Sequence, residues 1–251
     1  MLIDNLNKMN FDKMTPIQQI SMPGISKGHD VMGCSKTGSG KTLAFLLPII
    51  NSMLKYGAPS EDYNQNYYAY PVALILIPTR ELADQIYKET RKIIHKTGIN
   101  AVKIYGGVGQ EQQLRELRYG CDILIATPGR LIDFIKQNVI RLCSVKYFII
   151  DEADRLLDMG FEPQLNSIVF EKDLQDKSKR QNLMFSATFD ERVKSIARKF
   201  MNEYYYVQIN IEKESTNRVV QKLVYSEEDD KVFKLHEILQ NISGSVLSKI
   251  Y

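Results

Sequence analysis

A run of eight residues near the start of the chain has the composition of an anion-binding turn. The run consists of Ser35, Lys36, Thr37, Gly38, Ser39, Gly40, Lys41 and Thr42. Its glycines let the backbone curl tightly, so that N–H groups converge on one centre beside the positive end of the following helix. At this spacing Lys41 would reach the outer phosphates of a nucleotide, and Thr42 would offer its hydroxyl to Mg²⁺. The usual pattern opens with glycine, whereas this one opens with Ser35, and a flexible surface turn is the alternative interpretation.

A cluster of acidic residues is the second group that could take part in chemistry. Asp151, Glu152 and Asp154 directly follow the apolar run 145–150. A carboxylate in this place, across from a phosphate-binding turn, is where nucleotide-binding folds hold Mg²⁺. We expect Asp151 to bind the water shell of the metal and Glu152 to polarise the attacking water as a general base. A solvated acidic turn is the alternative.

Both groups need a scaffold that brings the ends of strands together. Apolar runs of strand length occupy residues 30–34, 72–77, 101–105, 123–126, 145–150, 183–185 and 205–209. Most of them are continuous rather than alternating in polarity, which is typical of strands covered on both faces. They alternate with stretches of helical periodicity, such as residues 43–54. We therefore predict an α/β fold with a doubly wound, mostly parallel sheet flanked by helices.

Polar and glycine clusters follow four more of these runs. They are Pro78, Thr79, Arg80 and Glu81; Gly106 and Gly107; Thr127, Pro128, Gly129 and Arg130; and Ser186, Ala187 and Thr188. The carboxyl ends of parallel strands lie along one edge of the sheet, and ligands bind at that edge in doubly wound folds. We expect these clusters to line the same edge as the glycine-rich turn.

The composition narrows the class of protein. The 251 residues are 44% hydrophobic and 25% charged, as in ordinary globular domains. The formal net charge of +3 does not by itself require a nucleic-acid partner, so any basic surface must be local. The three cysteines are far apart, which argues against a zinc site or a disulfide framework. Without a secretory pattern or an apolar run of ~18 residues, we expect no membrane association and a cytoplasmic or nuclear location.

The order of these motifs resembles that in the N-terminal RecA-like domain of DEAD-box RNA helicases, over about residues 2–210. The matching stretches are residues 15–18 (Q motif), 35–42 (motif I), 78–83 (motif Ia), 106–107 (double glycine), 127–130 (motif Ib), 151–154 (motif II) and 186–188 (motif III). This family accepts Ser at the opening position of motif I. Residues 158–161 and the tyrosine-rich stretch 56–70 look most like the subfamily of Vasa and the translation-initiation helicases.

The resemblance implies a nucleoside triphosphatase that uses ATP and Mg²⁺. Residues 35–42 would hold the phosphates, Thr42 and Asp151 the metal, and Lys41 and Glu152 would be catalytic. Gln18 offers donors and an acceptor to the donor–acceptor edge of adenine, whereas guanine shows only acceptors there. Phe11 matches the ring that stacks on the base, and Lys13 a further nucleotide contact. Helix capping by Gln18 and core packing of Phe11 are the alternatives.

The resemblance also implies a path for the RNA backbone. It would run across Pro78, Thr79, Arg80 and Glu81, then Gly106 and Gly107, then Thr127, Pro128, Gly129 and Arg130. None of these residues reads a base edge, so we expect sequence-tolerant, salt-dependent binding. Ion pairs of Arg80 with Glu81 and of Arg130 with Asp133 are the alternative. The family assigns Ser186 and Thr188 to coupling through hydrogen bonds toward Asp154, and a simple turn is the alternative there.

Two segments interrupt the alternation of strands and helices. We interpret residues 56–70 as an insertion loop that is either merely solvated or stacks its tyrosines on RNA bases. Residues 211–217 resemble a linker, whereas 219–225 and 231–239 have strand and helix patterns. About forty residues cannot build a second sizeable core. We therefore predict one RecA-like domain over residues 1–210, followed by an interdomain linker and the start of a second domain over 211–251.

These motifs together predict an ATP-dependent RNA helicase that locally separates RNA duplexes. A binding protein, namely an ATP-gated RNA clamp without unwinding, is the first alternative, and a DNA helicase of the same superfamily is the second. The expected partners are RNA and a second RecA-like domain, because motifs IV, V and VI of the family are absent from residues 1–251. We expect this chain alone to be a monomer with almost no RNA-stimulated ATPase activity.

Overall fold

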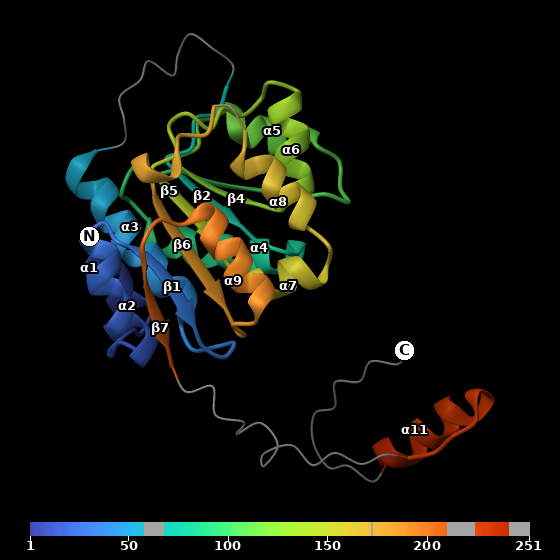
Figure 1. Cartoon of the computed structure of the whole chain (residues 1–251). Helices are drawn as coiled ribbons and strands as arrows, with labels where there is room; N and C mark the ends of the chain where they lie inside the picture. Colours follow the sequence, from blue (N-terminus) through green and yellow to red (C-terminus); the bar gives the residue numbers. More distant parts are fainter. Residues whose placement is uncertain (58–67, 172, 210–223, 241–251) are drawn as a thin grey trace. The chain divides into compact units, whose positions relative to one another are not determined.

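The computed structural model describes residues 1–57, 68–171, 173–209 and 224–240. The chain divides into two units, Met1–Ile211 and Glu212–Tyr251. The first unit contains the sheet and its flanking helices (Figure 1). Among the described residues, no helix is both long and apolar enough to cross a membrane.

The sheet has seven strands in the order β3-β4-β2-β5-β6-β1-β7. The strands are β1 (Asp30–Cys34), β2 (Ala73–Leu76), β3 (Ala101–Ile104), β4 (Ile123–Ala126), β5 (Tyr147–Ile150), β6 (Gln181–Ser186) and β7 (Tyr204–Gln208). Every pairing between these strands is parallel. The predicted α/β fold is confirmed, and all seven predicted strand positions contain a strand.

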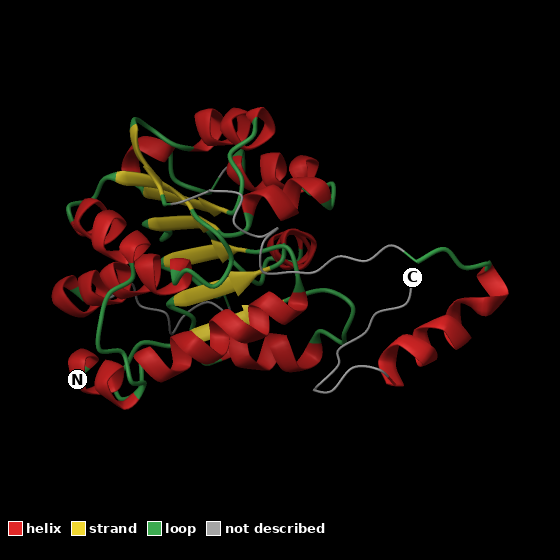
Figure 2. Ribbon diagram, turned by 90° about the horizontal axis from the view of Figure 1, so that it is seen from below, coloured by secondary structure: helices red, strands yellow, loops and turns green. Residues whose placement is uncertain are grey.

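The two faces of the sheet form two separate hydrophobic cores. Along β2, Ala73 and Ile75 belong to one core, whereas Leu74 and Leu76 belong to the other. Because both faces are covered, β2 and β4 are apolar at every position, which explains the continuous apolar runs in the sequence. Helices lie on both sides of the sheet in Figure 2.

The helices divide between the two cores according to their buried side chains. Buried residues of α2, α3 and α4 join the first core, and those of α5 to α9 join the second. The helices of the first unit are α1 (Leu2–Lys8), α2 (Pro16–Ser26), α3 (Lys41–Tyr56), α4 (Arg80–Ile93), α5 (Glu111–Arg118), α6 (Pro128–Lys136), α7 (Ala153–Asp158), α8 (Glu162–Val169) and α9 (Glu191–Phe200). A 3-10 turn at Lys177–Lys179 precedes β6. This three-layer arrangement is that of a doubly wound fold.

Local chemistry explains where several helices begin. Pro16 and Pro128 occupy the first helical position, where the missing N–H costs nothing. The side chain of Thr79 accepts a hydrogen bond from the amide of Leu82 and caps α4. These starts lie next to predicted site residues, so helix capping and site placement depend on the same residues.

A buried carboxylate holds the strand that leads into the glycine-rich turn. Asp30 starts β1 and accepts hydrogen bonds from the amides of Asn182 (2.7 Å) and Asn202 (2.8 Å). Asn182 lies on β6, and Asn202 precedes β7, the two neighbours of β1 in the sheet. Asp30 therefore fixes the start of β1 between both neighbours.

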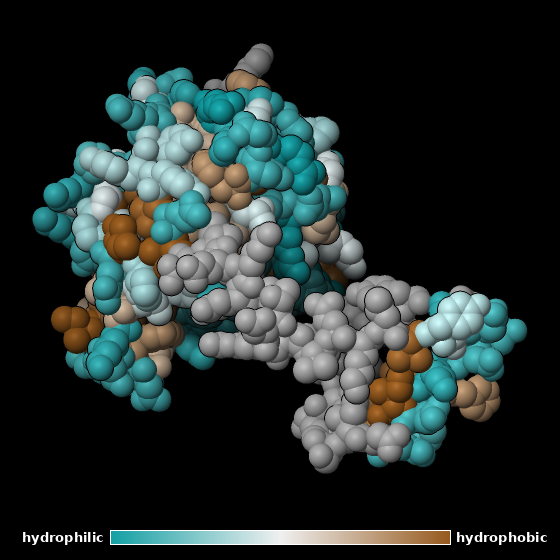
Figure 3. Space-filling model, turned by 60° about the horizontal axis from the view of Figure 1, so that its bottom comes forward, coloured by the Kyte–Doolittle hydropathy of each residue, from teal (hydrophilic) through white to brown (hydrophobic). Residues whose placement is uncertain are grey.

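The second unit contains a 3-10 turn at Glu228–Asp230 and the helix α11 (Lys231–Gln240). Val232, Leu235 and Leu239 recur along α11 at helical spacing. Figure 3 shows hydrophobic side chains gathered along one side of the described part of this unit. The predicted helix over 231–239 is thus present. Of the predicted strand over 219–225, residues 219–223 lie outside the described residues, and Val224 and Tyr225 are not in a strand.

The predicted insertion loop lies largely outside the described residues, which omit 58–67. At its edges, α3 ends at Tyr56, and Ala69 forms an isolated parallel bridge with Ile140. The interpretation of this segment as solvated or RNA-stacking stays a prediction.

Candidate nucleotide-binding site and nucleic-acid interface

The order of the strands sorts the predicted motifs into two neighbouring groups. The glycine-rich turn, the acidic cluster and residues 186–188 follow β1, β5 and β6, which are adjacent in the sheet. The clusters at residues 78–81, 106–107 and 127–130 follow β2, β3 and β4, which are also adjacent. All strands are parallel, so both groups lie along the carboxyl edge of one sheet (Figure 1).

The glycine-rich turn encloses the side-chain ammonium of Lys41. This residue begins α3 and is only 8% exposed. Its Nζ donates hydrogen bonds to the carbonyl oxygens of Ser35 (2.6 Å) and Lys36 (3.1 Å). The hydroxyl groups of Ser35 and Ser39 lie 2.7 Å apart and brace the turn. The positive charge is therefore held within the turn itself.

Gly40 has no room for a side chain. Its φ of +93° is strained for other residues, and a Cβ atom would lie 2.5 Å from Nε2 of Gln18. The close approach places the amide of Gln18 against the turn, where its Nε2 donates to the Gly40 carbonyl (3.0 Å). Glycine at this position thus lets α2 and the turn meet.

Gln18 uses both ends of its amide in the structure. Its Oε1 accepts a hydrogen bond from the amide of Thr15 at 2.9 Å, in addition to the contact with Gly40. Helix capping, the alternative interpretation of this residue, is therefore present. A side-chain amide has two N–H donors and a two-lone-pair oxygen, so one donor and one lone pair remain for a ligand.

The candidate site is a cavity of about 310 Å³, at the lower end of the range for small-molecule sites. Among the predicted site residues, its lining includes Phe11, Gln18, Thr37, Gly38, Gly40, Lys41, Thr42, Asp151 and Glu152. The structure thus brings together residues that are up to 141 positions apart, Phe11 and Glu152 being the extremes. Lys13, Ser35, Lys36 and Ser39 are not part of this lining.

Other residues of the cavity wall were not predicted from the sequence. Three of them, Leu82, Gln85 and Glu89, lie on α4 at positions i, i+3 and i+7. That spacing puts them on one helix face, which is the sequence signal that could have found them. Thr15 and Leu43 also line the cavity. Burial raises the pKa of Glu89 above its usual range.

The two carboxylates of the site lie in different surroundings. Asp151 is buried, and desolvation raises its pKa to about 7, against the opposing effect of the nearby Lys41 ammonium. Glu152 adopts a left-handed backbone with φ 51°, which is uncommon outside glycine. Its carboxylate forms an ion pair with Arg155 at 2.8 Å. One carboxylate is thus desolvated and the other is held by a cation.

Thr42 and Asp151 form a donor set that fits Mg²⁺. Both line the cavity, one with a hydroxyl and the other with a carboxylate. Within the described residues, no group of three or more His, Cys, Asp or Glu side chains is arranged to hold a metal ion. Mg²⁺ commonly binds through one or two protein oxygens together with phosphate oxygens and water. A site of this kind needs no larger cluster.

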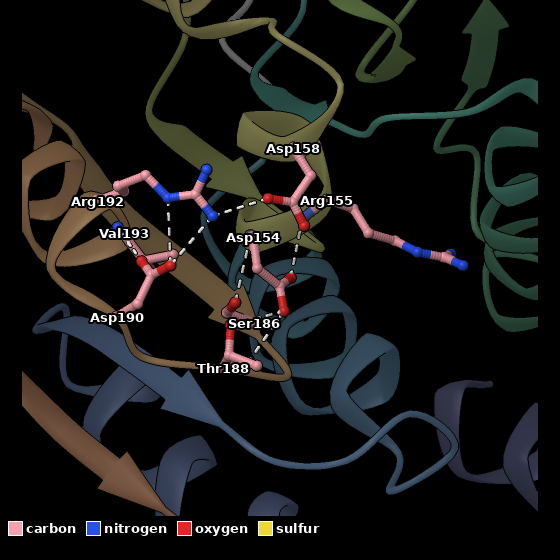
Figure 4. Close-up of polar contacts among 8 residues, drawn as sticks. All are labelled: Asp154, Arg155, Asp158, Ser186, Thr188, Asp190, Arg192 and Val193. Carbon is pink, nitrogen blue, oxygen red and sulfur yellow. Dashed lines mark hydrogen bonds and ion pairs between the residues drawn. The ribbon is translucent and has the colours of Figure 1, made fainter.

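Asp154 connects the acidic cluster to the segment after β6. Its backbone amide donates to Oγ of Ser186 (3.3 Å), and its Oδ2 accepts from both the amide and the hydroxyl of Thr188 (3.1 Å each). Figure 4 shows these three side chains converging. In the same view Arg192 lies between Asp190 and Asp158, and its hydrogen bond to Asp158 measures 2.8 Å. The segment 186–192 therefore contacts α7 at both its beginning and its end.

The second group of motifs is joined by contacts between neighbouring loops. The guanidinium of Arg80 lies 5.0 Å from the centre of the Tyr105 ring, and Arg130 donates to the carbonyl of Val108 at 2.9 Å. In the described part of the chain, neither arginine pairs with Glu81 or Asp133. The alternative based on those two ion pairs is therefore wrong.

The sequence model of one family, described as DEAD/DEAH box helicase, matches residues 15–196. The chain belongs to the DEAD/DEAH box helicase family. Together with the all-parallel sheet, this match identifies the first unit as the RecA-like domain of a DEAD-box protein. The prediction of the narrower Vasa-like subfamily stays a prediction.

Solved structures of similar proteins agree with the DEAD-box assignment. Prp28, an RNA helicase from Chaetomium thermophilum bound to ADP, is 38% identical with a TM-score of 0.72, over 96% of this chain and 55% of that one. The yeast DEAD-box splicing factor Prp28 is 33% identical with a TM-score of 0.76, over 96% and 56%. A hypothetical ATP-dependent RNA helicase from Sulfolobus tokodaii is 30% identical with a TM-score of 0.69, over 83% and 56%. The present chain thus spans about half the length of these relatives.

Proposed function

We propose that this chain is the ATP-binding half of an RNA helicase that hydrolyses ATP with Mg²⁺ and locally unwinds RNA. The observation that carries the proposal is the single cavity where Gln18, Lys41, Asp151 and Glu152 meet. ADP in the related Prp28 structure supports an adenine nucleotide as the ligand. Within this proposal, residues 211–251 are the linker and the start of a second RecA-like domain.

The residues of the cavity have distinct proposed roles in hydrolysis. Phe11 stacks on the base, Gln18 reads its edge, and Lys41 leaves the carbonyls of the turn for the outer phosphates. Thr42 and Asp151 hold Mg²⁺, which neutralises phosphate charge when bound. Glu152 accepts a proton from the attacking water.

RNA binds, in this proposal, along the neighbouring strand ends at residues 78–81, 106–107 and 127–130. Asp154, Ser186 and Thr188 couple RNA binding to the nucleotide cavity in this proposal. A shift of the segment after β6 would move α7 through the bonds to Asp154, and with it Glu152 at the start of α7. The family supplies further arginines from its second RecA-like domain, and such an arginine contributes roughly 10³–10⁵ in rate. We therefore propose that this chain alone has almost no RNA-stimulated ATPase activity.

The experiment that tests the proposal replaces Glu152 by Gln. It measures Mg-ATP binding and RNA-stimulated ATP hydrolysis, both in this chain alone and with the second domain restored. We expect Glu152→Gln to retain Mg-ATP binding and to lose turnover, because the shape stays while the base is removed. Glu162→Gln is the matched control, since Glu162 is a solvent-side residue of α8 that pairs with Lys199.

Unchanged turnover in Glu152→Gln would show that Glu152 is not the base. RNA binding and ATP turnover without strand separation in the two-domain protein would favour an ATP-gated clamp. Competition by DNA as strong as that by RNA of the same sequence would favour a DNA helicase.

A further inference from the structure

The loop between β3 and α5 contains the double glycine and has three successive backbone amides without a hydrogen-bond acceptor among the described residues. Gly106 and Gly107 are exposed, and a Cβ atom at either would meet nothing within 4 Å. In the described part of the chain, the backbone amides of Gly106, Gly107 and Val108 have no hydrogen-bond acceptor. The donors of this loop are therefore available to a ligand.

Three carbonyl groups that flank the double glycine accept hydrogen bonds from side chains of two helices. Gln113, on α5, donates from Nε2 to the carbonyls of Tyr105 (3.2 Å) and Gly109 (3.4 Å). Arg130, on α6, donates to the carbonyl of Val108 (2.9 Å). The oxygen of the Gln113 amide accepts from the Tyr105 amide at 2.9 Å. Gln113 thus joins the two ends of the loop and is itself only 7% exposed.

We infer that Gln113 is a positioning residue that sets the double-glycine loop to receive a backbone phosphate of single-stranded RNA. The hydrogen bonds to the Tyr105, Val108 and Gly109 carbonyls hold the loop on both sides of the double glycine, and the three successive free amides of residues 106–108 can form an anion site. Gly107 contributes the φ of +78° that this backbone path needs. This inference rests on the RNA interface proposed above and adds a residue outside it.

Glutamine suits this position because the loop requires a donor and an acceptor from one side chain. A lysine would only donate and a carboxylate would only accept, so neither could satisfy the Tyr105 amide and the two carbonyls together. Its neighbour Gln112 offers a natural contrast. Gln112 is exposed, and its amide bonds Glu116 on the same helix at 3.1 Å rather than the loop.

Arg130 also holds the double-glycine loop in place. Its guanidinium holds Val108 from α6, and its Nη1 is buried without a partner in the described residues. The sequence-based expectation gave this arginine a direct phosphate contact. The geometry assigns it, like Gln113, to holding the loop.

The test compares Gln113→Met with Gln112→Met in the 251-residue chain. Methionine keeps the length of the side chain and removes all three hydrogen bonds to the loop. The ¹⁵N-labelled proteins are titrated with a single-stranded oligoribonucleotide and, separately, with ADP, while the amide signals of Gly106 and Gly107 are followed by NMR. Gln113→Glu keeps the acceptor for the Tyr105 amide and serves as a second variant, with Gln112→Glu as its charge-matched control.

We expect Gln113→Met to bind RNA about tenfold more weakly, the size of one lost hydrogen bond to a charged group. The Gly106 and Gly107 signals would no longer respond to RNA, whereas ADP affinity would stay unchanged. The dependence of RNA affinity on salt would also keep its slope, because neutral amides release no counterions. Gln112→Met would behave as the unmodified protein.

Three results would overturn the inference in distinguishable ways. Equal RNA affinity of Gln113→Met and the unmodified chain, with intact Gly106 and Gly107 responses, would exclude the positioning role and leave the proposed function standing. A parallel loss of RNA and ADP binding would show a general loss of structure instead. Failure of the unmodified chain to bind RNA at low salt would overturn both the inference and the proposed RNA interface.

Discussion

Gln18 illustrates, at the scale of one residue, how a ligand contact and a structural contact share one side chain. Its amide bonds the start of α2 through Thr15 and the glycine-rich turn through Gly40. If this amide binds the edge of a base, as proposed, its position is linked to that of the turn proposed to hold the phosphates. Replacement of Gln18 should affect both base preference and the affinity for any nucleotide.

For Gln18→Ala we expect a smaller preference for ATP over GTP, by about 1–3 kcal/mol for the lost paired contacts. Binding of each nucleotide, measured by isothermal titration calorimetry, provides the comparison. Gln19→Ala is the matched control, because Gln19 is exposed and its side chain bonds the Met14 carbonyl rather than Thr15 or the turn. If the unmodified protein bound ATP and GTP equally, Gln18 would have no role in reading the base.

Single residues also show where prediction from the sequence succeeded and where it stopped. Lys41 and Asp151 were found because a motif places them at the ends of predicted strands, and the structure puts both in one cavity. Glu89 was missed because its approach to the cavity depends on how α4 packs against the sheet. Arg130 follows a predicted strand, but its bond to Val108 depends on a neighbouring loop that no local pattern describes.

At the scale of elements, the sheet was predictable because burial on both faces makes its strands continuously apolar. The order of the strands was not, because it depends on which crossover each helix takes. One consequence of that order is the contact between edge strand β7 and the segment after β6. Phe189 and Tyr206 stack with their rings 4.3 Å apart and tilted by 23°, so the edge strand supports residues 186–188.

Replacing Tyr206 by Leu should loosen the segment after β6, because an aromatic pair contributes about 0.5–1.5 kcal/mol beyond its buried area. The amide of Thr188, which bonds Asp154, would then exchange its hydrogen faster with solvent. Tyr205→Leu is the control on the same strand, since Tyr205 contacts His29 instead. Equal exchange at Thr188 in both variants would exclude support by the Phe189 stack.

At the scale of the whole molecule, the two hydrophobic cores and the cavity all belong to the unit Met1–Ile211. The cavity wall combines α2, α4, the glycine-rich turn and the segment after β5. A ligand that contacts all four would join these parts by further contacts, in addition to the sheet and the direct bond between Gln18 and Gly40. Nucleotide binding should therefore stabilise the unit as a whole.

We expect ADP at about one hundred times its Kd to add about 2.7 kcal/mol to the free energy of unfolding. In a protein of this size that corresponds to a rise in Tm of about 5–10 °C, measured by circular dichroism. Lys41→Ala should abolish most of the rise, because a phosphate contact is lost. Lys55→Ala, at the exposed far end of the same helix, should keep it, and a rise that survives in Lys41→Ala would place the phosphates elsewhere.

The ammonium of Lys41 is already hydrogen-bonded within the turn, to the carbonyl oxygens of Ser35 and Lys36. When a nucleotide binds, the Lys41 ammonium must exchange these two carbonyl oxygens for phosphate oxygens. An incoming anion must compete with two carbonyl dipoles, and a polyphosphate chain brings several charged oxygens to that competition, whereas a single small anion brings few. We therefore expect the turn to favour ligands with several charged oxygens, such as a polyphosphate, over single small anions.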